Sequence, residues 1–143
     1  MPYYVEGWIE VVWDVSLEDE IQQWSGVINL ERFHFHGDDV PDLLFGLTKH
    51  PCDNPYFAKQ GVPEDCSKQV ADEVKRDKEF FKKYGEGNIN YTYAKWSEIA
   101  EHLNELEQAE DFDDWNVIFS MVQIMCERKF EPEWIRFVMW GNW

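Results

Sequence analysis

The residues whose spacing best suits metal chemistry are His34 and His36. On an extended strand, side chains two residues apart project to the same face, so both imidazoles would point the same way. His50 or Cys52 would complete such a set. No other feature of the sequence requires a third ligand, so we favour two half-exposed histidines at a strand end, with no bound cofactor.

Aromatic and acidic side chains alternate in the N-terminal segment, which is a more informative pattern. Tyr4, Glu6, Trp8 and Glu10 share one face of a strand by its period of two. Ring faces attract positive charge and carboxylates pair with it, so this combination suits a cationic group. We therefore expect this face to be in contact with solvent or with a partner.

The same chemistry recurs near the C-terminus, where Trp134 and Trp140 lie on a predicted final strand. Together with Tyr4, Glu6, Trp8 and Glu10, these two tryptophans are the residues that we expect to bind a ligand or partner. Two partners fit it: a basic protein surface, with rings as anchors and acids for steering, or a small organic cation in an aromatic, acidic pocket. The opposing interpretation is that Trp8, Trp134 and Trp140 pack in the sheet core.

Covalent catalysis has little support in the sequence. Cys126 falls on the apolar stripe of a predicted helix, which indicates a buried structural thiol. Cys52 and Cys66 flank a long loop without a basic neighbourhood. No phosphate-binding loop, dinucleotide fingerprint, zinc-protease motif or nucleophile elbow is present. We expect no catalytic residue and favour a protein that is not an enzyme.

Composition restricts the class of partner. The 143 residues carry 29 acidic and 13 basic side chains, for a formal charge of −16, together with 8 tryptophans. Phosphates attract Lys and Arg, so nucleic acid and anionic membranes are disfavoured as partners. The aromatic content argues against disorder. Three cysteines without a CxxC spacing, and no signal peptide, favour a cytoplasmic protein.

The periodicity of the chain predicts a single α+β domain over residues 1–143. Period-two patterns and β-forming residues predict strands over 3–15, 27–35, 89–95 and 134–140. Helical spacing and capping residues predict three longer helices over 67–83, 97–106 and 115–129, and short helices near 17–24 and 40–45. Pro and Gly make 47–66 an irregular loop, which either serves a function or is pinned over the core by Tyr56 and Phe57.

Strands at both ends of the chain, with helices between them, indicate one mainly antiparallel sheet that includes the terminal strands. The function we expect is that of a non-enzymatic acidic protein, of the inhibitor or immunity type, that engages a basic protein surface. The alternative is a binding module for a small cationic or amphipathic ligand. A metal-dependent enzyme that uses His34 and His36 is the third.

Overall fold

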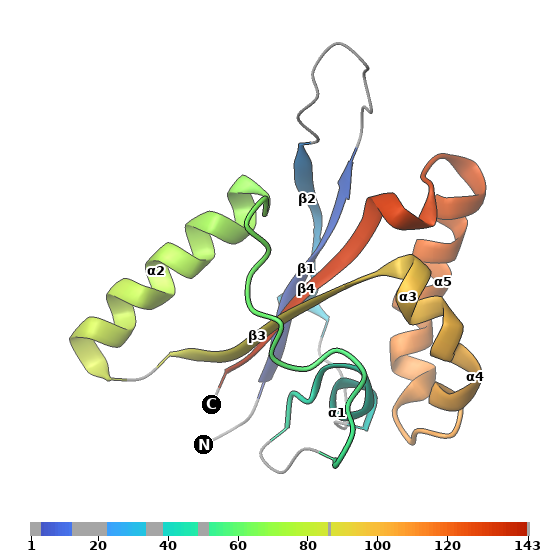
Figure 1. Cartoon of the computed structure of the whole chain (residues 1–143), viewed down its shortest axis with the longest axis horizontal. Helices are drawn as coiled ribbons and strands as arrows, with labels where there is room; N and C mark the ends of the chain where they lie inside the picture. The colour runs from blue at the N-terminus through green and yellow to red at the C-terminus, as the bar shows by residue number, and fades with distance from the viewer. Residues whose placement is uncertain (1–3, 13–22, 34–38, 49–51, 86, 143) are drawn as a thin grey trace.

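The fold is built on an antiparallel sheet whose central pair joins the two ends of the chain (Figure 1). The computed structural model describes residues 4–12, 23–33, 39–48, 52–85 and 87–142. Within them, the strands are β1 (Tyr4–Val12), β2 (Trp24–Asn29), β3 (Asn88–Lys95) and β4 (Ile135–Asn142). Their order is β2-β1-β4-β3 and every neighbouring pair is antiparallel, which confirms the predicted sheet.

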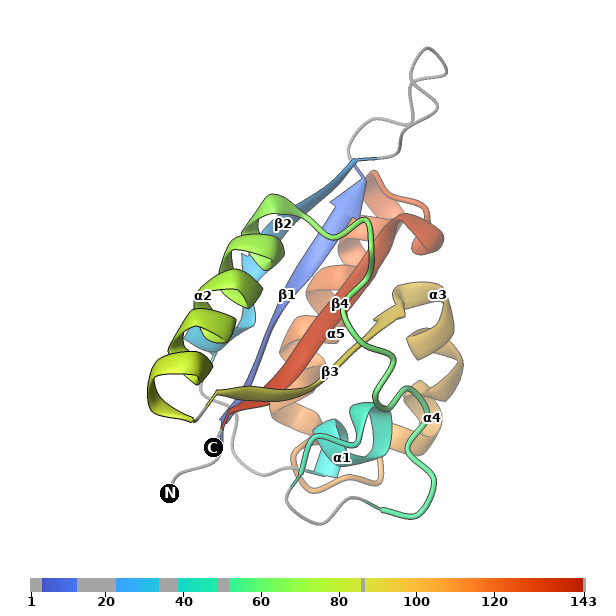
Figure 2. The same ribbon diagram turned by 60° about the vertical axis from the view of Figure 1, so that its left-hand side comes forward.

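The helices cover both faces of this sheet. They are α1 (Asp39–Phe45), α2 (Lys68–Tyr84), α3 (Trp96–Ile99), α4 (Leu103–Leu106) and α5 (Phe112–Arg128). Short 3₁₀ turns lie at η1 (Leu30–Arg32), η2 (Ala100–His102) and η3 (Pro132–Trp134). Helix α2 lies alone on one face, and the remaining helices lie on the other (Figure 2). The α+β class is therefore confirmed.

Strand alternation divides β1 and β4 between two apolar clusters. Ile9 and Val11 of β1 and Phe137 of β4 belong to the main core, under α1, α3 and α5. Val138 and Trp140 point the other way and form a smaller cluster with Val70 of α2. Because helices cover both faces, neither side of the central strands is free to carry a purely polar surface.

Helix α5 places the predicted apolar stripe in the core. Trp115, Ile118, Phe119 and Val122 are all buried. They follow the i, i+3, i+4, i+7 pattern of a helix with one face against a sheet. The helix begins three residues earlier than predicted, at Phe112, so the acidic stretch before it is shorter.

Gly7 allows β1 and β4 to approach each other. A Cβ at this position would collide with the carbonyl oxygen of Val138 and lie 2.6 Å from the Sδ atom of Met139. The glycine within the apolar face of β1 is thus a requirement of packing, since a larger side chain would force the two central strands apart.

The predicted irregular loop is held down over its described part, residues 52–66. Phe57 is buried in the main core. The backbone N–H groups of Tyr56 and Phe57 donate to the carbonyl oxygens of Leu43 and Leu44, at 3.0 and 2.7 Å. Farther along, Gly61 N–H donates to the carbonyl oxygen of Tyr91 on the β3 edge at 2.8 Å. The buried Phe57 and these backbone hydrogen bonds therefore pin the described part of the loop over the core, while the side chain of Tyr56 stays 40% exposed.

Other boundaries also differ from the sequence-based expectations. The second strand spans Trp24–Asn29 rather than 27–35, because the chain turns into η1 at Leu30. The predicted helix near 17–24 falls outside the described residues apart from Gln23 and Trp24, and Trp24 begins β2. Trp134 lies in η3 and not on the final strand.

Among the described residues, no helix is long and apolar enough to cross a bilayer.

Candidate functional site

The face of β1 that carries Glu6, Trp8 and Glu10 lies beneath α2. Glu10 is 0% exposed and Trp140, on the neighbouring strand, is 1% exposed. Trp8 is half-buried, and its Nε1 donates to Glu73 Oε1 of α2 at 2.7 Å. The expectation that this face is in contact with solvent or with a partner is wrong at Glu10, because α2 supplies the covering layer.

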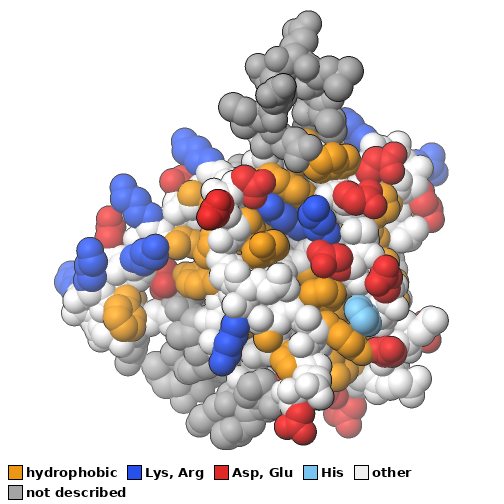
Figure 3. Space-filling model, in the orientation of Figure 1, with side chains coloured by type: hydrophobic (Ala, Val, Ile, Leu, Met, Phe, Trp, Pro, Cys, Tyr) orange, Lys and Arg blue, Asp and Glu red, His pale blue; other side chains and the backbone are white. Residues whose placement is uncertain are grey.

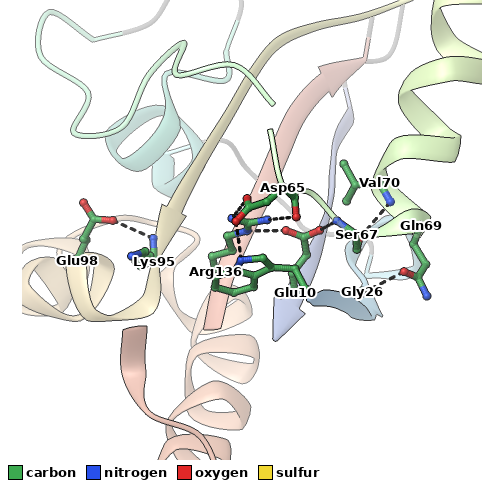
Figure 4. A network of polar contacts seen from close by, with 10 residues as sticks. Glu10, Gly26, Asp65, Ser67, Gln69, Val70, Lys95, Glu98 and Arg136 are labelled. Carbon is green, nitrogen blue, oxygen red and sulfur yellow. Dashed lines mark hydrogen bonds and ion pairs between the residues drawn. The ribbon is translucent and has the colours of Figure 1, made fainter. Parts of the chain in front are cut away.

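Glu10 forms a buried ion pair with Arg136, which faces it from β4 (Figure 4). Arg136 Nε lies 2.6 Å from Glu10 Oε1, and its Nη1 lies 2.8 Å from Asp65 Oδ1. The second oxygen of Glu10 accepts the backbone N–H of Ser67 at 2.5 Å. Since Ser67 is the N-cap of α2, the pair attaches the start of that helix to the centre of the sheet.

Trp24 completes this cluster from β2. The guanidinium of Arg136 lies 3.8 Å from the ring centroid of Trp24, and Trp24 Nε1 donates to Asp65 Oδ2 at 3.1 Å. Burial raises the pKa of Asp65, but the hydrogen bond and charge of Arg136 outweigh it, so the pKa lies below its ordinary value. Both Glu10 oxygens are engaged inside the protein, which indicates a structural clamp rather than an acid–base pair.

Glu6 occupies the opposite end of the same face. Trp140 Nε1 donates to Glu6 Oε2 at 3.1 Å, and Asn142 Nδ2 donates to its Oε1 at 3.3 Å. The Trp140 ring packs against Tyr91 at 5.4 Å between centroids. Because the ring is buried and the carboxylate already accepts its N–H, these groups do not form an open aromatic pocket for a cation.

We expect Glu6→Gln to stabilise the protein at neutral pH. Burial raises the pKa of Glu6 above its ordinary value of 4.5, despite the hydrogen bond from Trp140, and the carboxylates of Glu31 and Glu73 raise it further. The folded state therefore binds the Glu6 proton more tightly, and ionisation costs stability as pH rises through the raised pKa. Glutamine keeps an acceptor oxygen for Trp140 and removes the charge.

The gain should be below about 1 kcal/mol in urea unfolding at pH 7.5, because the group is half-exposed and screened. It should become smaller at pH 4.0, where the carboxyl is mostly protonated in both states. Glu107→Gln, an exposed carboxylate beyond α4, is the control for the loss of one negative charge. An equal gain in both variants would show that net charge, and not the burial of Glu6, is responsible.

The remaining candidate binding residues do not converge with these. Tyr4 is exposed at the start of β1, beside the partner position Asn142. Trp134 is half-buried beyond the other end of β4 and lies 6.4 Å from Trp24, ring to ring. The six predicted residues are therefore spread along the length of the sheet instead of lining one site.

The metal hypothesis falls on residues that the structure does not describe. His34, His36 and His50 all lie outside the described ranges. Within those ranges, no group of three or more His, Cys, Asp or Glu side chains is arranged to hold a metal ion. Burial raises the pKa of the Cys52, Cys66 and Cys126 thiols, which disfavours the reactive thiolate.

Helix α5 has a second apolar face, which the sequence interpretation missed. Val117 and Ile124 are each 56% exposed and Met121 is 37% exposed. Their i, i+4, i+7 spacing places them in one row, on the side of the helix away from Trp115 and Ile118. We call these three residues the α5 stripe. The spacing could have been seen in the sequence, but the stronger inward stripe concealed it.

Exposed carboxylates are frequent on α5 and in the segments that flank it along the chain. They lie on α5 and on the helical segments and turns before and after it: Glu98, Glu101, Glu105, Glu107, Glu110, Asp113, Glu127, Glu131 and Glu133. Between α3 and η3, the exposed bases are Arg128 and Lys129. Figure 3 shows acidic side chains over α3 and α4 and a gathering of Lys and Arg over α2. The region over α2 and the region over α3 and α4 therefore differ in charge.

Comparison with known proteins identifies no relative, because no protein family, curated protein or solved structure matches this chain.

Proposed function

We propose that this chain is a non-enzymatic interaction protein that engages a basic protein surface through α5. The observation that carries the proposal is the α5 stripe, an exposed apolar row within a strongly acidic side of the molecule. Apolar side chains at the centre of an interface supply most of the binding energy, and surrounding charges set the association rate and the choice of partner.

The size of the stripe indicates a transient contact. Val117 and Ile124 are seven residues apart, which is about 10 Å along a helix. A contact of this length would bury a small area, in the class of protein–protein interfaces below about 1,200 Å² in total. A partner with Lys and Arg around a few apolar side chains would match it in both charge and size.

The polar clusters elsewhere support a binding role over a catalytic one. Glu10, Arg136 and Asp65 satisfy one another inside the protein, and the Glu6 carboxylate accepts hydrogen bonds from Trp140 and Asn142. The ligand-binding alternative would need Trp140 to leave its buried position. The basic-partner proposal needs no rearrangement of the described residues.

The test is affinity capture followed by binding measurements on the captured protein. The immobilised baits are the wild type and an α5 serine variant, which carries Val117→Ser, Met121→Ser and Ile124→Ser. An α2 serine variant, with Phe80→Ser, Phe81→Ser and Tyr84→Ser, serves as the matched control. Both variants change three exposed residues and leave the net charge at −16. Mass spectrometry then identifies the proteins that the wild type and the α2 serine variant capture and the α5 serine variant does not.

We expect the identified partner to be basic and to bind the wild type and the α2 serine variant alike. Calorimetric titration should show affinity falling by at least about tenfold between 0.05 and 0.5 M NaCl, because exposed charges are screened. The proposal fails if capture is unaffected by the α5 changes, or if the affinity is independent of salt.

A further inference from the structure

The C-terminal half of α2 extends its apolar side beyond the cluster that it covers. Val70 of this helix is fully buried and Val74 is half-buried against Trp140. Phe81 continues the same helical row, yet it is 57% exposed. Tyr84 is also 57% exposed and Phe80 is 49% exposed, with the rings of Phe80 and Tyr84 4.6 Å apart. Among the residues that the structure describes, no element covers these three aromatic rings, which form an exposed apolar surface at one helix end.

This surface is basic, unlike the rest of the described molecule. The exposed bases from position 75 to the end of α2 are Lys75, Arg76, Lys78, Lys82 and Lys83, and Glu79 is the one exposed acid among them. The acids of the helix are partly turned inward, since Glu73 accepts Trp8 Nε1 and Asp77 accepts the Tyr91 hydroxyl. Helix α2 therefore presents its bases to solvent while two of its acids face the sheet. We call Phe80, Phe81, Tyr84 and these bases the α2 surface.

The α2 surface is complementary to the acidic surface of α5. One has aromatic rings among Lys and Arg, and the other has aliphatic side chains among Glu and Asp. Helices α2 and α5 lie on opposite faces of the sheet (Figure 2), so the two surfaces cannot meet within one chain. A second copy of the chain brings them together without any rearrangement.

We propose that copies of this protein associate head to tail, with the α2 surface of one copy seated on the α5 stripe of the next. This inference rests on the proposed function, because it names a basic surface that the acidic side of the protein binds. The contact is heterologous: a pair of copies leaves an unused α5 stripe on one copy and an unused α2 surface on the other, so association continues beyond two copies. Net repulsion between copies of charge −16 keeps the association weak.

Sedimentation velocity of the full chain tests this directly, at 10 to 500 μM protein in 0.15 M NaCl. The wild type should show a weight-average mass that rises with concentration above the 17.2 kDa of one copy. The α2 serine variant and the α5 serine variant should each remain at the mass of a single copy, because each lacks one of the two surfaces. Circular dichroism melts confirm that both variants are folded.

Mixing the two variants gives the decisive result. The α2 serine variant keeps its acidic α5 surface, and the α5 serine variant keeps its basic α2 surface. In an equimolar mixture, one copy of each variant should therefore pair through a single contact, and no further copy can add. The weight-average mass should approach twice 17.2 kDa and rise no further. A symmetric dimer through α5 alone, or through α2 alone, would instead be formed by one of the unmixed variants, and that outcome overturns the inference.

A charge control separates local pairing from net charge. Lys82→Gln with Lys83→Gln, and Lys59→Gln with Lys68→Gln, both take the charge from −16 to −18. Only the first pair lies beside the exposed rings, so only that pair should reduce the association. Equal effects of both pairs, or a wild type that stays at 17.2 kDa, count against the head-to-tail contact. If the copies do not associate but affinity capture still yields a basic partner that depends on the α5 stripe, the proposed function holds and only the head-to-tail contact is wrong.

Discussion

Arg136→Met is expected to destabilise the protein by about 3–5 kcal/mol, as removal of one member of a buried ion pair generally does. The guanidinium of Arg136 is the cation that faces the fully buried carboxylate of Glu10, at 2.6 Å. Methionine fills much of the volume but leaves that charge without compensation. Arg136 also joins β4 to Asp65 and to the ring of Trp24, so three separate segments lose their common contact.

The double variant Glu10→Leu, Arg136→Met is the control. Replacing a buried pair with apolar side chains is often close to neutral, so the double variant should be more stable than Arg136→Met alone. Urea unfolding followed by tryptophan fluorescence measures both. A single variant that loses under 1 kcal/mol, or a double variant that loses as much as both single changes together, would show that the two charges are not coupled as described.

Phe119→Ala is expected to cost about 3–5 kcal/mol, which is the usual range for removing a large aromatic side chain from a core. Phe119 is 2% exposed, and its ring lies 5.8 to 6.3 Å from those of Trp96, Trp115 and Phe137. The ring of Phe112 also lies 6.3 Å away. A gap bounded by four aromatic rings closes only in part, so much of the cavity would persist.

Val117→Ala on the same helix is the matched comparison for Phe119→Ala. Val117 is on the outward face, so its truncation should change stability by less than about 0.5 kcal/mol. Chemical unfolding of both variants at one pH gives the difference. If Val117→Ala were the more damaging change, the inward and outward faces of α5 would be reversed relative to this structure.

Much of the fold was predictable because its signals are local. Ser67 caps α2 through its side chain and Gly85 ends it in a left-handed conformation, as the sequence suggested. The apolar spacing of Trp115 to Val122 identified the buried face of α5. The period of two in the N-terminal segment identified β1, with its odd-numbered residues facing the main core. Each of these patterns depends on residues within a few turns of one another.

The candidate site could not be predicted as well, because its contacts join distant segments. Glu10 and Arg136 are 126 positions apart, and Arg136 and Asp65 are 71 apart. The alternation of side chains along the strand placed Glu10 on the correct face of the sheet, but it does not predict that α2 covers that face. A lone arginine within the apolar strand 135–140 was the available clue, since buried arginine requires an acidic partner.

The pairing of β1 with β4 determines when this sheet can form during synthesis. Of the strands that the structure describes, the two central ones are the first and the last in sequence, with Tyr4 opposite Asn142. The edge strands β2 and β3 each pair with one of these and not with each other. The sheet therefore stays incomplete on the ribosome until residue 142 has left the exit tunnel. Until then, the apolar residues of β1 lack their main partner, and unpaired apolar strands of this kind are prone to aggregate.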